Sequence, residues 1–188
     1  MDREGVEVWL KEYDIKDYTI NEDLSVDVAG DVDLSAKCLS KIPVKFRNIS
    51  GTFDCEDNEL TNLEGFPINI SGNLYCGSNQ LTDLMGCPEV IGGGFYCDNN
   101  RLVSLIGCPT SVVGFDCSDN RLVSLNGCPE VVGGDFYCSY NNLSDSEDFL
   151  YEYSSDQVVQ YYKNKNLNEG LLVVLPEVIG IGIKSKKI

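Results

Sequence analysis

Residues 93–109 read Gly-Gly-Phe-Tyr-Cys-Asp-Asn-Asn-Arg-Leu-Val-Ser-Leu-Ile-Gly-Cys-Pro. This stretch recurs along the chain and therefore indicates a repeat fold. Similar segments begin at Gly51, Gly72, Gly114 and Gly134. One cysteine series advances by 21, 21, 20 and 21 residues, and one asparagine series keeps the same register. The two series are Cys55, Cys76, Cys97, Cys117 and Cys138, and Asn58, Asn79, Asn100, Asn120 and Asn141. A fixed period of this length is typical of a solenoid.

The residue types within one repeat indicate what each part does. Phe-x-Cys is a period-two pattern that predicts a short strand with two inward side chains. The asparagine follows where the chain must bend, and its amide can pair with backbone groups of adjacent turns. The next two leucines point back inward, and Gly-Cys-Pro ends the segment. One turn cannot bury its apolar side alone, so we expect stability to come from stacking neighbouring turns.

The repeat resembles the leucine-rich-repeat family, whose core is Leu-x-x-Leu-x-Leu-x-x-Asn-x-Leu. It is most similar to the short bacterial type and to bacteriophage repeat proteins with units such as Phe-Tyr-Cys-Ser-x-Asn-x-Leu-x-x-Leu-x-Gly-Cys-Pro. The resemblance covers residues 28–143 closely and departs in having Cys at the second strand position. It implies parallel strands on a concave face and an irregular convex side. It does not imply a function, because these repeats serve many partners.

The resulting organisation is one domain with a repeat region between two caps. Residues 28–39 fit as a degenerate first turn, so six turns are expected over residues 28–143. Residues 1–27 predict an N-terminal cap, with an amphipathic helix over 5–14 followed by a hairpin. Residues 144–188 predict a C-terminal cap that is helical first and then a strand or tail.

Composition narrows the function classes. The chain has 188 residues, 30 Asp and Glu against 14 Lys and Arg, and a formal net charge of −16. Such a surface repels nucleic acid and anionic membranes, so neither is an expected partner. Histidine is absent, which removes the commonest general base. The sequence contains neither a signal region nor an apolar stretch long enough to span a membrane. We therefore expect a cytoplasmic protein with free thiols. For a phage protein this would be the cytoplasm of the host.

The cysteine series and the asparagine series, called the cysteine ladder and the asparagine ladder below, are both interpreted as structural. Neither a metal nor a cofactor is expected. Zinc sites cluster their ligands at spacings such as Cys-x-x-Cys, which the sequence lacks. Free cysteine also packs as a small hydrophobe. Cys38 lies outside both ladders, and the sequence predicts no role for its thiol.

The candidate binding residues flank the inward Phe and Cys of each strand, on the concave side. Tyrosine is enriched at binding hot spots, and carboxylates steer a basic partner. The alternative is that polar residues merely solvate the strand surface, where tyrosine is common anyway. The candidates at these positions are Asp54, Glu56, Tyr75, Tyr96, Asp98, Asp116 and Tyr137. Tyr140 is added as the residue that precedes the asparagine Asn141 of the repeat.

The function expected from these patterns is a non-enzymatic protein-binding module. The phage resemblance suggests a host protein as partner and inhibition of a host defence or regulatory factor as the role, acting as a monomer or weak homo-oligomer. One alternative is a polyanion mimic that sequesters a basic protein, and another is a structural or assembly protein. Carboxylates of adjacent turns could share a cation or alter each other's pKa. An open solenoid face, however, seldom provides the pocket that catalysis needs.

Overall fold

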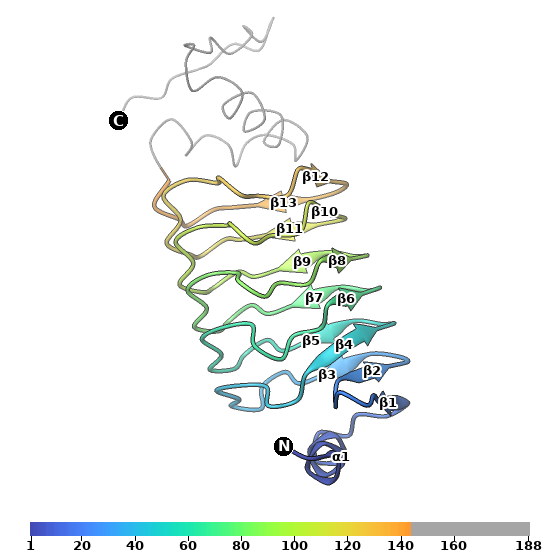
Figure 1. Ribbon diagram of the computed structural model, residues 1–188. Coiled ribbons are helices and arrows are strands. Elements are labelled where there is room, and N and C mark those ends of the chain that lie inside the picture. Colours follow the sequence, from blue (N-terminus) through green and yellow to red (C-terminus); the bar gives the residue numbers. More distant parts are fainter. Residues whose placement is uncertain (144–188) are drawn as a thin grey trace, which may run out of the picture.

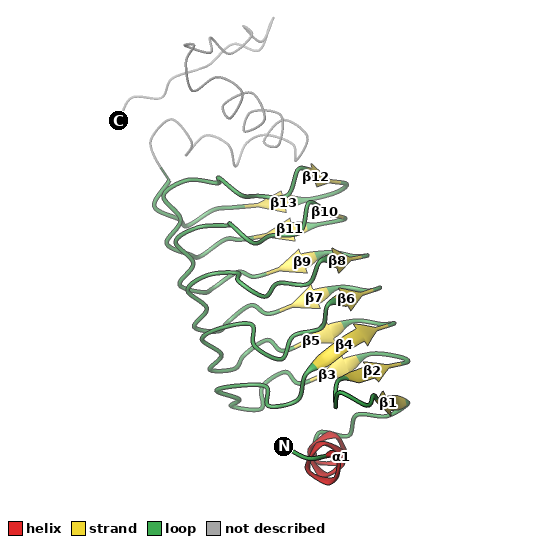
Figure 2. Cartoon of the chain, in the orientation of Figure 1, coloured by secondary structure: helices red, strands yellow, loops and turns green. Residues whose placement is uncertain are grey.

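The computed structural model describes residues 1–143, which form a parallel β-solenoid (Figure 1). Each turn runs out along one short strand, bends, and returns along a second short strand before crossing a loop to the next turn. The strands therefore stand in two columns, with the loops on the far side (Figure 2). Successive turns are about 21 residues apart, as the repeat predicts.

The first column is a six-stranded parallel sheet built from the Phe-x-Cys segments. Equivalent residues pair directly, so Phe53 lies opposite Leu74 and Leu74 opposite Phe95. The degenerate first turn takes part, since Val32 pairs with Phe53. The sheet comprises β3 (Val32–Asp33), β5 (Phe53–Asp54), β7 (Leu74–Tyr75), β9 (Phe95–Tyr96), β11 (Phe115–Asp116) and β13 (Phe136–Tyr137).

The second column lies beside the first (Figure 2), and beyond its first hairpin it was not predicted from the sequence. It contains a five-stranded sheet and a two-stranded sheet, and within it only the first pair, β1 with β2, is antiparallel. The strands are β1 (Tyr18–Ile20), β2 (Val26–Val28), β4 (Phe46–Ile49), β6 (Asn69–Ile70), β8 (Val90–Ile91), β10 (Ser111–Val112) and β12 (Val131–Val132).

The core is continuous along the solenoid axis and contains the apolar residues of every turn. Phenylalanines of consecutive turns touch, with ring centroids of Phe95 and Phe115 5.7 Å apart and those of Phe115 and Phe136 5.3 Å apart. The ladder cysteines fill the next inward position and are buried. Burial of stacked apolar side chains is the main stabilising term here, as in other repeat proteins.

The asparagine ladder joins each turn to its neighbours. Asn100 donates from Nδ2 to the carbonyl oxygens of Cys76, Cys97 and Asp98 at 3.0, 3.2 and 3.1 Å. Its Oδ1 accepts from the backbone N–H of Leu81 at 2.9 Å. Asn58, Asn79, Asn120 and Asn141 repeat this pattern. The ladder thus pairs backbone groups that burial would otherwise leave unsatisfied.

The N-terminal residues cover the first turn. Helix α1 (Arg3–Glu12) begins after Asp2, whose side chain accepts from the Gly5 N–H. Its buried side includes Trp9, whose ring centroid lies 6.3 Å from that of Phe46. The expected hairpin is present, with Ile20 paired to Val26. The expected C-terminal cap lies outside the described residues.

Candidate protein-binding face

The outward side of the six-stranded sheet, called the six-stranded face below, displays the predicted binding residues. Phe and Cys point inward and are buried, while the residues between them stay partly or fully exposed. Strand register stacks the outward residues about 4.8 Å apart along the axis. The central column is Asp33, Asp54, Tyr75, Tyr96, Asp116 and Tyr137.

Tyr75 and Tyr96 form a stacked pair in the middle of this column. Their ring centroids are 4.8 Å apart and their planes differ by 9°. The Tyr75 hydroxyl accepts from Asn73 Nδ2 at 2.9 Å. The Tyr96 ring lies across Gly94, where a β-carbon would come within 2.4 Å of its hydroxyl oxygen. A side chain at position 94 would therefore collide with the Tyr96 phenol ring, and the glycine leaves room for it.

Tyr137 and Tyr140 lie apart from this pair. Asp116 occupies the column position between Tyr96 and Tyr137, so the aromatic stack is interrupted at that turn. Tyr137 is 53% exposed and Tyr140 is 80% exposed. Tyr140 lies beyond its strand, in a left-handed bend with φ of 55°. The same bend recurs in every turn, at Ala36, Asp57, Ser78, Asn99 and Asp119.

Three of the predicted carboxylates are half-buried and have acidic neighbours. Burial, together with the charges of neighbouring Asp residues, raises the pKa of Asp54, Glu56 and Asp98 above the usual values. Glu56 and Asp98 come from different turns and lean over Gly77 of the turn between them. A β-carbon at Gly77 would lie 2.8 Å from Asp98 Oδ1 and 3.2 Å from Glu56 Oε1.

Basic residues do not neutralise these carboxylates within the described chain. The outward strand positions from residue 31 to residue 139 carry neither Lys nor Arg. The ion pairs found among residues 1–143 are Lys11–Glu7, Lys16–Asp14 and Arg47–Asp27, all away from this face. Lys37 influences a carboxylate only at the edge of this face. It makes a small contribution to the lowered pKa of Asp33, which comes mainly from Ser35 hydrogen bonds.

The cysteine ladder lies directly beneath this face. Burial raises the thiol pKa of Cys55, Cys76, Cys97 and Cys117 well above the usual value. Over residues 1–143, no group of three or more Cys, Asp or Glu side chains is arranged to hold a metal ion. Cys38 is exposed, whereas the five ladder cysteines are buried. The buried thiols therefore act as packing groups.

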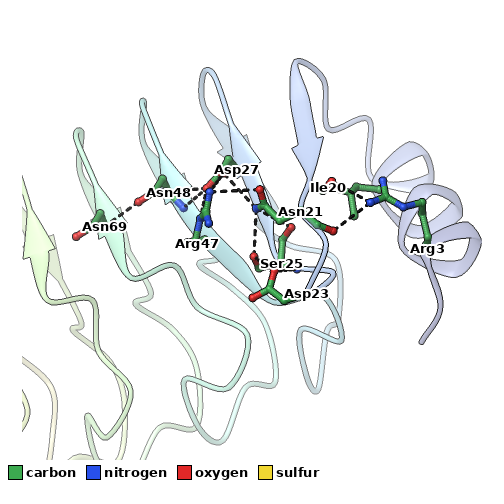
Figure 3. A network of polar contacts seen from close by, with 9 residues as sticks. All are labelled: Arg3, Ile20, Asn21, Asp23, Ser25, Asp27, Arg47, Asn48 and Asn69. Carbon is green, nitrogen blue, oxygen red and sulfur yellow. Dashed lines mark hydrogen bonds and ion pairs between the residues drawn. The ribbon is translucent and has the colours of Figure 1, made fainter.

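The second column carries a polar network that the sequence analysis missed (Figure 3). Asp27 accepts from Arg47 Nε at 2.9 Å and also from the other side of the Arg47 guanidinium. Asn69 donates to Asn48 at 2.8 Å, and Asn48 donates to Asp27 at 2.7 Å. The Arg47 guanidinium, followed by hydrogen bonds from the Asn21 and Asn48 side-chain amides, lowers the pKa of Asp27 to about 2. The sequence signal for this network is short, because asparagine recurs only at the paired positions Asn48 and Asn69.

A shallow groove of about 310 Å³ lies beside this network. Its walls come from the hairpin and the next two turns, and they carry carboxylate, amide and hydroxyl groups. The polar side chains that line it are Asp17, Thr19, Asp27, Asn48, Ser50, Asn69 and Ser71. Within this lining, Asn69 donates to Asn48 and Asn48 donates to Asp27, whose carboxylate also accepts from Asn21 and Arg47.

Within the described residues, no helix is long and apolar enough to cross a membrane. Comparison of the chain with family models, with curated proteins and with solved structures found no match. The fold is a parallel β-solenoid with repeats of about 21 residues. On one of its faces a tyrosine pair lies close to half-buried carboxylates.

Proposed function

We propose that this protein is a non-enzymatic binding module that engages a partner protein through the six-stranded face. The observation that carries the proposal is the Tyr75–Tyr96 pair, which lies next to carboxylates that have no basic neighbour on the face. Tyrosine offers a large contact area at low entropic cost. Uncompensated carboxylates attract a basic partner and accelerate its approach.

The geometry supports a pre-organised binding surface. Tyr75 is held by the Asn73 hydrogen bond and Tyr96 by its packing over Gly94. A side chain that is already ordered loses little conformational entropy when a partner binds. Tyr137 and Tyr140 extend the aromatic area towards the last described turn. The surface is broad and open, which suits a protein better than a small molecule.

The resemblance to leucine-rich-repeat proteins of bacteriophage suggests which partner to test first. We infer a host protein in the bacterial cytoplasm, with the chain acting as an inhibitor of a defence or regulatory factor. The resemblance rests on the Phe-x-Cys-x-x-Asn-x-Leu unit, and the role inferred from it is part of the proposal.

The test is capture of partners from a bacterial lysate by the tagged chain, identified by mass spectrometry. The informative variant carries Tyr75→Ala, Tyr96→Ala and Tyr137→Ala together. A matched control carries Met85→Ala, Ile106→Ala and Val123→Ala, three residues on the loop side that are 68%, 67% and 63% exposed. We expect the tyrosine variant to lose the partner and the control to keep it. Equal recovery by both variants would contradict the assignment of this face.

The charge supports a second candidate function, polyanion mimicry. A net charge of −16 would let the chain compete with nucleic acid for a basic protein. This candidate predicts that affinity falls steeply with salt and that bound nucleic acid is displaced from the target. An affinity that depends on the tyrosines and changes little with salt favours the first proposal.

A further inference from the structure

The six-stranded face also indicates the chemistry of the partner, an inference that rests on the binding role proposed above. Its key feature is the place where Glu56 and Asp98 lean over Gly77 from the turns on either side. In the equivalent column position the other turns carry Ser35, Ser118 and Ser139, or the two acids themselves. Only this turn combines a glycine with an acid on each side.

The two carboxylates face the same small volume. Oxygen atoms of both lie within 3.2 Å of the point where a Gly77 β-carbon would stand. Neither side chain has a salt bridge among the described residues. Like charges this close repel, and the raised pKa of each carboxyl group reflects burial first and its acidic neighbours second. A positive group placed between them would relieve this repulsion.

The tyrosine pair borders the same place. Tyr75 is two residues before Gly77 on the same turn, and Tyr96 is two residues before Asp98 on the next. Alternation along a strand puts all four on the outward side. The aliphatic stem of a lysine or arginine can pack against an aromatic side chain while its charged end reaches a carboxylate. The face thus offers an apolar contact and a charge contact side by side.

We propose that the six-stranded face takes a basic segment of its partner and seats one cationic side chain between Glu56 and Asp98, over Gly77 and beside the Tyr75–Tyr96 pair. The face supplies the negative charge and the aromatic surface, and the partner supplies the positive charge. Lysine and arginine share the required chemistry, so the experiment includes both.

The test measures fluorescence anisotropy of labelled peptides titrated with the full chain at physiological salt. The probes are (Gly-Lys)₄, (Gly-Arg)₄ and the acidic peptide (Gly-Glu)₄. The test variant carries Glu56→Gln and Asp98→Asn. The control variant carries Asp83→Asn and Glu89→Gln, which removes the same formal charge from exposed positions away from this face.

We expect one or both cationic peptides to bind and the acidic peptide not to bind. The Glu56→Gln, Asp98→Asn variant should lose roughly three- to tenfold in affinity, as for half-buried charge pairs. The control should lose less than about twofold, because exposed charges contribute little. Gly77→Ser, which introduces the residue found in other turns, should also weaken binding by displacing Asp98. If the lysine and arginine peptides differ in affinity, the tighter-binding peptide identifies the preferred side chain.

Two results would overturn the inference. The first is an equal loss in both double variants, because binding would then follow net charge alone. The second is the absence of binding by either cationic peptide. A lysate partner that still requires the tyrosines but ignores Glu56 and Asp98 would leave the binding role intact and refute only the cationic seat. Peptide binding at Glu56 and Asp98 without a tyrosine-dependent partner would refute the binding role assigned to the tyrosines.

Discussion

At the scale of single residues, the ladder asparagines hold neighbouring turns together. Each reaches the backbone of its own turn and of the preceding turn, so one side chain satisfies several buried groups at once. Asn100 is only 8% exposed, so water does not replace these partners. Asn141 makes the same set of bonds at the last described turn but is half-buried. The same residue type therefore occurs in two environments within one molecule.

We predict that Asn100→Ala destabilises the protein by about 3 kcal/mol, because it leaves buried carbonyl and N–H groups without partners. Asn141→Ala should cost about 1 kcal/mol, because water reaches the groups that it exposes. Urea unfolding followed by circular dichroism under identical conditions measures both changes. Equal losses of stability in the two variants would show that burial does not determine how much each ladder asparagine stabilises the protein.

At the scale of elements, the sequence predicted those strands that have a repeated two-position pattern. Phe-x-Cys places two buried side chains on one strand, and six strands follow from it, including the degenerate one at Val32. Beyond the predicted hairpin, the second column escaped prediction because most of its strands are two residues long with one buried side chain each. Its outward residues also change from turn to turn, from Asp27 through Asn48 to Val90. A ladder without a constant residue gives no periodic pattern.

The candidate site could be predicted only in outline. Alternation identified which residues point outward, and burial agrees with it for the Phe, Cys and Tyr positions. The tyrosine stack and the pairing of Glu56 with Asp98 depend on side-chain direction across turns. That direction follows from the glycines at positions 77 and 94, which the sequence analysis did not connect to their neighbours.

Gly86 and Gly107 occupy the same position of two successive repeats, in the loop of each turn. Gly86 has φ of +90° and Gly107 has φ of +102°, so alanine is strained at both. A β-carbon at Gly107 would also lie 2.7 Å from the Leu84 carbonyl oxygen, whereas at Gly86 the nearest atom is 3.6 Å away. Gly107→Ala should therefore destabilise by about 1 kcal/mol or more beyond Gly86→Ala, since the backbone must move. Thermal unfolding of the two variants provides the comparison, and a larger loss at Gly86 would contradict it.

At the scale of the whole molecule, the charges act in two opposing ways as pH falls. Asp54, Glu56 and Asp98 have raised pKa values, so the folded state binds protons on them more readily than the unfolded state does. Their protonation on acidification therefore favours folding. Asp27 behaves in the opposite way, because its pKa is lowered to about 2 by Arg47. Its contribution is present above the usual value of 3.8 and is lost as pH falls towards 2.

We therefore expect stability to rise as pH falls from neutrality towards the ordinary values of 3.8 for Asp and 4.5 for Glu, and then to fall. Thermal unfolding across this range measures the profile. The Glu56→Gln, Asp98→Asn variant should show a smaller rise, because two of the groups that take up protons are gone. The Asp83→Asn, Glu89→Gln control separates this effect from general relief of the −16 net charge. An unchanged rise in the first variant would mean that general repulsion, and not the carboxylates over Gly77, sets the acid response.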